Sequence, residues 1–205
     1  MTGFSELYVC CNSAVLSEFG RKYILNMDRD EFIVLNEEQA TYVQMNNSEN
    51  FDPYLSEGLR KFIESRNQSG EVRSTNEQKI INRKKCQKFI IRRWIEKKGE
   101  EKTNPETISV WIDHDIDFNL EPFYQLMDNL RYLRGSDKKL RNEMKKLEGA
   151  QMAVEIVKKG SPGEKRFISE VVELSKKHVD ENAFSVPSGY KRKEKLTKSD
   201  LRIYN

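Results

Sequence analysis

The 205-residue chain has few of the residues and runs that mark secreted, membrane or zinc-binding proteins. It has three cysteines without CxxC spacing and two histidines, so neither a disulfide framework nor a zinc site is predicted. No apolar run approaches the length of a membrane span. Residues 1–20 lack a cationic start followed by an apolar run, which predicts no secretion signal. We therefore expect an intracellular protein, cytoplasmic or nuclear, with its three thiols reduced and buried.

The chain also lacks the short motifs that identify common enzymes. Walker A, GxGxxG, GxSxG and HExxH patterns are all absent. We expect no cofactor and no bound metal, and the sequence favours a protein without enzymatic activity.

The residues that are present indicate a folded but polar chain. Ten Phe, eight Tyr and two Trp supply core material, so the chain is not expected to be disordered. Charged residues make up 34% of the chain and the mean hydropathy is −0.79, which fits helices with wide solvated faces.

Local patterns predict an α+β fold with a small N-terminal antiparallel sheet and a mainly helical body of about five helices. Short β-prone runs between residues 5 and 45, and a run at 108–113, predict the strands. Capping residues, prolines and helical spacing predict the helices. The predicted helices are 53–66, 76–98, 120–134, 137–159 and 162–179. We expect residues 1–186 to form a single compact domain, followed by a basic C-terminal tail at 187–205.

Leucines recur every seven residues in the second half of the chain. The repeat consists of Leu126, Leu133, Leu140, Leu147 and Val154. The alternate core positions include polar Asp137 and Gln151, where a continuous coiled coil would need apolar residues. The pattern favours a bent pair of helices in a bundle, while a zipper would make a homodimer through the helices of residues 120–159.

Basic charge is concentrated in residues 79–98. This segment has nine basic residues and one acidic residue, a net charge of +8 in a chain whose total is +3. On a helix, Lys84, Lys88 and Arg92 would form one outward stripe with a spacing of about 6 Å, close to that of phosphates along a strand. The alternatives are a solvated face balanced by the acidic first 66 residues, and a surface for an acidic protein or a membrane.

The sequence-based hypothesis is therefore an intracellular protein that binds the phosphate backbone of nucleic acid. The predicted contact residues lie in the basic helix and in the basic tail. They are Lys84, Lys85, Lys88, Arg92, Arg93, Lys191, Arg192 and Lys193. The chief alternative is a protein-interaction subunit or inhibitor without nucleic-acid contact.

A third hypothesis rests on an acidic triplet, Asp113, Asp115 and Asp117, that begins at the last residue of the predicted strand at 108–113. If the strand continued, the three carboxylates would point to one side, as in metal-dependent phosphodiester enzymes. The partner motifs of such enzymes are missing, so the pattern favours a polar strand-to-helix loop in which an aspartate supports the next helix N-terminus.

Overall fold

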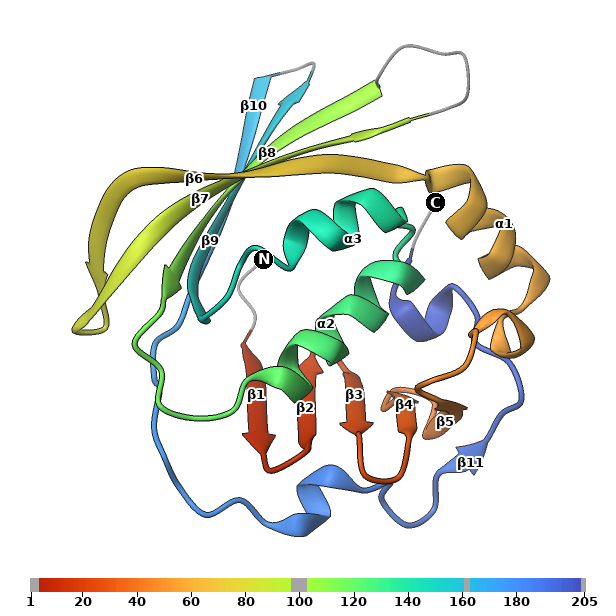
Figure 1. Cartoon of the computed structure of the whole chain (residues 1–205). Coiled ribbons are helices and arrows are strands. Elements are labelled where there is room, and N and C mark those ends of the chain that lie inside the picture. Colours follow the sequence, from red (N-terminus) through yellow and green to blue (C-terminus); the bar gives the residue numbers. More distant parts are fainter. Residues whose placement is uncertain (1–3, 97–102, 161–162, 204–205) are drawn as a thin grey trace. The chain divides into compact units, whose positions relative to one another are not determined.

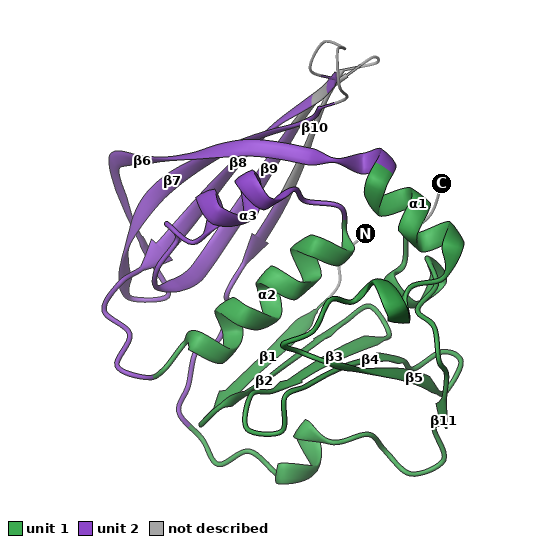
Figure 2. Cartoon of the chain, turned by 45° about the vertical axis from the view of Figure 1, so that its right-hand side comes forward, with its two compact units in different colours: residues 1–64, 119–134, 177–205 green, residues 65–118, 135–176 purple. Residues whose placement is uncertain are grey.

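The computed structural model describes residues 4–96, 103–160 and 163–203. The structure is 45% strand and 22% helix, so the fold is mainly β rather than mainly helical. The chain divides into two compact units, which Figure 2 shows in different colours. Unit 1 consists of residues 1–64, 119–134 and 177–205, and unit 2 consists of residues 65–118 and 135–176.

Unit 1 is built on a six-stranded sheet in the order β1-β2-β3-β4-β5-β11. The first five strands form an antiparallel meander with short turns (Figure 1), and the last strand joins β5 in parallel. The strands are β1 (Ser5–Cys10), β2 (Ser13–Glu18), β3 (Arg21–Asn26), β4 (Glu31–Asn36), β5 (Thr41–Asn46) and β11 (Lys191–Arg192).

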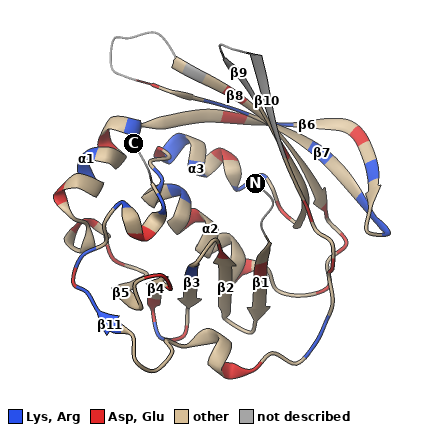
Figure 3. Cartoon of the chain, turned by 180° about the vertical axis from the view of Figure 1, so that it is seen from behind, with Lys and Arg blue, Asp and Glu red and all other residues tan. Residues whose placement is uncertain are grey.

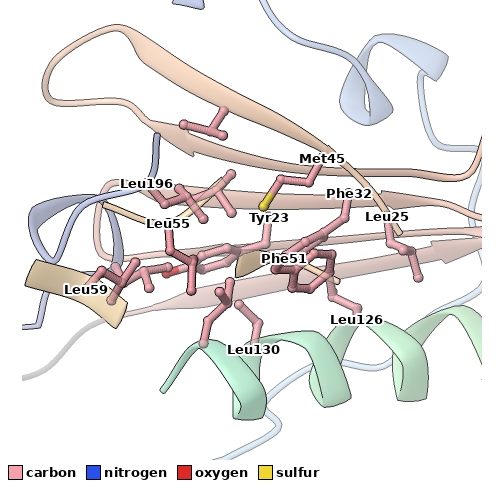
Figure 4. Packing of buried hydrophobic residues seen from close by; sticks show 14 of the residues in the cluster. Tyr23, Leu25, Phe32, Met45, Phe51, Leu55, Leu59, Leu126, Leu130 and Leu196 are labelled. Atoms are coloured by element: carbon pink, nitrogen blue, oxygen red, sulfur yellow. The ribbon is translucent and has the colours of Figure 1, made fainter. Parts of the chain in front are cut away.

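Both faces of this sheet are covered by other parts of unit 1. On one face, the helix α2 (Glu121–Leu133) packs its leucines against the sheet, together with residues of α1 (Glu57–Arg66) and of the short helices η1 (Asp52–Tyr54) and η3 (Ser199–Leu201). Figure 4 shows Leu126 and Leu130 beneath Tyr23 and Phe32. The other face packs against η2 (Glu181–Phe184) and the extended chain after it. Burial on both faces explains why β4 contains an uninterrupted apolar run.

Unit 2 is a five-stranded antiparallel sheet in the order β10-β9-β8-β7-β6, with one helix packed on it. Its elements are β6 (Gln68–Ile81), β7 (Lys84–Ile95), β8 (Thr103–Asp113), α3 (Lys138–Met144), β9 (Ala150–Gly160) and β10 (Gly163–Glu170). Alternate residues of β7 and β8, including Phe89, Ile91 and Val110, form its apolar core with Leu140 and Leu147. Unit 2 therefore has its own hydrophobic core.

The prediction of a mainly helical body was wrong. The N-terminal antiparallel sheet is present, and α1 and α2 lie within the predicted helices 53–66 and 120–134. Residues 76–95 of the predicted helix 76–98, however, belong to the β6–β7 hairpin, closed by Asn82 and Arg83 with φ angles of 46° and 64°, while residues 97–98 lie outside the described residues. Two consecutive residues with positive φ make a type I′ turn, which matches the twist of paired strands.

The other two long helices were also predicted wrongly. In the predicted helix 137–159 only α3 is helical, and the rest contributes β9. The predicted helix 162–179 contains β10 and an extended segment, while its expected start at Ser161 and Pro162 lies outside the described residues. β9 instead pairs with β8 and β10, and this pairing satisfies its backbone groups while Met152 and Ala153 are buried.

The leucine repeat does not form a helix pair. Leu126 and Leu133 belong to the core of unit 1, whereas Leu140 and Leu147 belong to the core of unit 2. Val154 lies in β9. The predicted homodimer through helices at 120–159 therefore loses its structural basis, because the repeat is used for burial within two different cores.

The predicted single domain at 1–186 corresponds to a chain that divides into two units, and the predicted tail is folded into unit 1. Lys191–Arg192 is strand β11, and Leu196 and Leu201 are buried. Two buried leucines give this segment enough apolar contact to hold it in place. Within the described ranges, no helix combines the length and the apolar character needed to cross a membrane.

Candidate functional site

The basic segment forms the outer end of the β6–β7 hairpin. The last residue of β8, Asp113, pairs with Cys86, so β7 has no neighbour other than β6 before that point. Residues Ile80–Lys85 therefore form a two-stranded ribbon that extends past the end of β8. Figure 3 shows basic residues gathered around this turn. We call residues 79–85 the ribbon tip.

The ribbon tip has four cationic side chains, Lys79, Arg83, Lys84 and Lys85. Arg83 and Lys85 are exposed, and neither makes an ion pair with any other described residue. Nζ of Lys79 lies 3.8 Å from Glu170, and Nζ of Lys84 lies 3.8 Å from Oδ2 of Asp113. The Lys79 pair is long and about half exposed, so it contributes little, whereas the Asp113 carboxylate is buried and keeps Lys84 near it. Lys79, Arg83 and Lys85 are therefore the cations best placed to contact an external anion.

The cations further along β7 are engaged within the protein. Lys88 bonds Glu77 at 2.9 Å, and Arg93 bonds Glu106 at 2.6 Å. Arg92 lies 4.0 Å from Glu71, which also pairs with Arg73 at 3.1 Å. The acidic residues of the same sheet therefore neutralise much of the charge that the sequence concentrates in residues 79–98.

The side chains of Lys84, Lys88 and Arg92 lie on one side of β7, as the predicted stripe requires. The spacing between them differs from the spacing expected for a helix. Residues four apart face the same way in a helix and also in a strand. In a strand they lie about 13 Å apart rather than about 6 Å. Lys85 and Arg93 face the opposite side, so the five predicted residues of this segment do not form one continuous surface.

The predicted contact residues near the C-terminus lie in unit 1, outside the hairpin. Lys191 and Arg192 form β11 beside β5, and both are exposed. Lys193 bonds both carboxylate oxygens of Asp200, at 2.9 and 2.8 Å. Lys193 is therefore a structural residue, while Lys191 and Arg192 stay accessible.

The acidic triplet does not converge on one point. The strand ends at Asp113, and residues 114–118 are not part of a strand, so the expected alternation stops there. Asp113 is buried and accepts the backbone N–H of Asp115 at 3.0 Å. Asp117 is exposed and bonds Lys176 at 2.6 Å, a hydrogen bond that lowers the pKa of Asp117. Across the ranges that the structure describes, no group of three or more His, Cys, Asp or Glu side chains is placed to hold a metal ion.

Two buried groups, the Cys86 thiol and the Asp113 carboxylate, lie at the base of the ribbon. Cys86 is fully buried opposite Asp113, and this burial, together with the Asp113 carboxylate, raises the pKa of the Cys86 thiol. Oδ2 of Asp113 is buried without a hydrogen-bond partner, and Lys84 is the cation closest to satisfying it. Lys84 is thus held near the base of the ribbon, while Arg83 and Lys85 project from its end.

The sequence-based reasoning missed two features of this surface. Lys79 and Arg83 were not among the predicted contact residues. The indole of Trp111, predicted only as part of a strand, lies 6.0 Å from Nζ of Lys79 and 5.6 Å from Nζ of Lys88. Asn-Arg between two isoleucine-rich runs was the available signal for a turn.

A hollow with a volume of about 410 Å³ lies beside this hairpin within unit 2. It is lined by Val72, Ser74 and Phe89, with Arg73 and Lys146. Both cations pair with glutamates, Arg73 with Glu71 and Lys146 with Glu143. The hollow therefore adds no net charge to the ribbon tip.

Comparison with known proteins places the chain in a family. The family model described as a domain of unknown function (DUF4412) matches residues 13–190, from the start of β2 to the residue before β11. No curated protein and no solved structure matches the chain. Because the match includes both units and most of the chain, the protein belongs to the DUF4412 family.

Proposed function

We propose that this chain is a non-enzymatic intracellular binding protein whose ribbon tip contacts the phosphate backbone of nucleic acid. The observation that supports the proposal is the position of Arg83 and Lys85. Both are exposed and outside the ion pairs of the described residues, at the end of a ribbon that extends past β8. Lys79 lies beside them with only a long, half-exposed ion pair, and Lys84 lies beside them at 3.8 Å from the buried carboxylate of Asp113.

The shape of the ribbon agrees with this partner. A two-stranded β-ribbon is narrow enough to enter the major groove of a duplex. Arginine can bond a phosphate with two parallel N–H groups, whereas a lysine acts as a point charge. Four cations would make at most about four phosphate contacts, and each would contribute about 0.9 to the slope of log affinity against log salt. We therefore expect modest, strongly salt-dependent binding with little sequence preference.

An acidic protein surface is the alternative partner. The ribbon tip already faces carboxylates within its own chain, namely Asp113 and Glu170. An external protein could present the same groups. Nucleic acid is favoured because its regular charge suits four cations clustered in seven residues, and because the paired cations of β7 reduce the area that a protein partner could use.

The test replaces Arg83 and Lys85 together with glutamine. The matched control replaces Lys191 and Arg192, which are also exposed and lose the same charge, but which lie in unit 1. Binding to a fluorescent duplex and to a single strand is measured by anisotropy over a salt series. We expect the hairpin variant to lose about two units of salt slope and the control to lose little.

Two results would contradict this proposal. Equal losses in the hairpin variant and the control would mean that only total charge matters. Undiminished binding in the hairpin variant would place the contact elsewhere. If instead polyglutamate binds the ribbon tip and nucleic acid does not, the protein-interaction alternative is correct. The melting temperatures of both variants should match that of the parent protein, since none of the four side chains is buried.

A further inference from the structure

Cys10 and Cys11 bring two accessible thiols together at the first turn of unit 1. Cys10 is the last residue of β1, and Cys11 is the first of the two residues that connect β1 to β2. Their Sγ atoms are 3.4 Å apart, within hydrogen-bonding distance for sulfur, and both residues are exposed. The sequence had predicted that these thiols are buried, and that prediction was wrong; Cys86 alone is buried.

The backbone at Cys11 is responsible for this arrangement. In a continuing strand, neighbouring side chains point to opposite faces. Cys11 has a φ of +52°, in the left-handed region that residues other than glycine seldom adopt. This turn ends the alternation and places both sulfur atoms on the same side of the chain.

Direct oxidation is not the reaction that this geometry favours. Adjacent Cα atoms are about 3.8 Å apart across a trans peptide, whereas the Cα atoms of a disulfide are usually separated by at least about 4.4 Å. Closing a bond between Cys10 and Cys11 would therefore distort the turn. An atom bonded to both sulfur atoms needs no such distortion, because the two sulfur atoms then stay well beyond the length of a disulfide bond.

The number of available ligands limits which kind of atom the two thiols can bind. A structural zinc ion needs four protein ligands, and across the described residues no group of three or more His, Cys, Asp or Glu side chains is placed to hold a metal ion. The two thiols can instead bind a thiophilic atom that needs only two sulfur ligands from the protein. A trivalent arsenical with one organic group is the simplest source of such an atom.

We propose that Cys10 and Cys11 form a two-sulfur binding site for a trivalent arsenical or a chemically equivalent thiophilic group. With an organoarsenic(III) oxide, each thiol loses its proton as one arsenic–sulfur bond forms. The oxide oxygen leaves as water with the two protons, and arsenic stays trivalent. No oxidant or reductant is needed. The adduct closes a small ring at the turn and leaves the β1–β2 pairing unchanged.

The state of the free thiols agrees with this chemistry. The hydrogen bond with Cys11 raises the pKa of the Cys10 thiol, and partial desolvation and the nearby Glu181 act in the same direction. Cys10 is therefore mainly protonated near neutral pH, which makes it a slow nucleophile toward reagents that capture one thiol. A reagent that captures both thiols gains from their proximity, since the second bond forms within one molecule.

The test uses the reduced full-length chain and phenylarsine oxide, with intact-mass and peptide mass spectrometry as the readout. We expect one phenylarsine group per chain, bound with loss of one water and located on the peptide that contains residues 10 and 11. Cys10→Ser and Cys11→Ser should each weaken retention on the order of 100-fold or more. Cys86→Ser should retain the adduct. Excess reduced glutathione should not remove the group, whereas a small dithiol should.

Several outcomes would overturn the proposal. These are an absence of adduct on the parent chain, an equally tight adduct on either single variant, or an adduct that requires Cys86. Because Cys10 and Cys11 are exposed, their serine variants should fold, and the circular dichroism spectra of all variants establish this before binding is measured. Location of the adduct by peptide mapping in the parent chain keeps the test decisive even if Cys86→Ser is unstable.

Discussion

Lys193 donates hydrogen bonds to both carboxylate oxygens of Asp200, at 2.9 Å to Oδ1 and 2.8 Å to Oδ2. Asp200 is almost fully buried and also accepts hydrogen bonds from the backbone N–H and the hydroxyl of Thr197. The side-chain amide of Asn36, at the end of β4, donates a further hydrogen bond at 3.2 Å. A lysine that the sequence predicts as a nucleic-acid contact instead forms an ion pair within the C-terminal segment, and Asn36 connects the Asp200 carboxylate of that pair to the sheet of unit 1.

We expect Asp200→Asn to destabilise unit 1 by about 2–4 kcal/mol, because the substitution leaves Lys193 half-buried without its counter-charge. Urea denaturation followed by circular dichroism measures the change. Glu194→Gln is the matched control, since Glu194 is exposed and loses the same charge. Equal stability of the two variants would show that the ion pair makes no net contribution.

The same carboxylate predicts a pH dependence. Burial alone would raise the pKa of Asp200, but the hydrogen bonds from Lys193, Thr197 and Asn36 outweigh it and lower that pKa. Because the folded-state pKa lies below the unfolded value of about 3.9, this group contributes its full stability above that pH. The contribution is lost as the pH falls from there through the folded-state pKa. The free energy of unfolding should fall less steeply below about pH 4 in Asp200→Asn than in the parent chain.

Gly149 should not tolerate alanine, whereas Gly58 should. Gly149 has a φ of +118°, and a Cβ there would lie 2.4 Å from the carbonyl oxygen of Asp113. We expect Gly149→Ala to cost about 3 kcal/mol or more through backbone strain and steric overlap. In Gly58→Ala, the added Cβ meets no atom within 4 Å, and alanine favours helix α1 by about 0.5–1 kcal/mol. Thermal melting compares the two, and a Gly149→Ala variant as stable as the parent would refute the prediction.

The two central leucines of the heptad repeat should behave as core residues rather than as a dimer seam. Leu133 is fully buried in unit 1, and Leu140 is buried in unit 2. We expect Leu133→Ala and Leu140→Ala each to cost about 2–5 kcal/mol. Unfolding midpoints measured over a 100-fold range of protein concentration should shift by the same amount throughout. A loss of stability that grows on dilution would instead indicate a leucine-mediated dimer.

Local sequence patterns predicted the structure correctly where a pattern is compatible with only one type of secondary structure. Pro122 and the acidic Glu121 begin α2 at the place that the sequence indicates. Short β-prone runs before residue 46 become strands of the N-terminal sheet, because each is bounded by turn residues. The basic segment at 79–98 was also evident from the sequence, because the net charge of a segment depends only on its residues.

Local signals failed where one pattern suited two structures. Phe89 and Ile91 are two residues apart and both are buried, which is the period of a strand, yet Cys86 and Ile90 also fit the period of a helix. One edge of β7 pairs with β6 across the turn at Asn82 and Arg83, but its other edge pairs with β8, about 20 residues further along the chain. No local window contains that partner.

The sequence by itself determined most of the N-terminal strands, the start of α2 at Pro122 and the concentration of basic charge, because these depend on residues near one another in the chain. Only the tertiary structure decided which cations are accessible. Glu106 neutralises Arg93, Asp200 holds Lys193, and Arg83 and Lys85 stay free of ion pairs among the described residues. Each of these outcomes depends on a neighbour brought close by strand pairing or by burial, and the strength of an ion pair is set by that distance and by exposure to water.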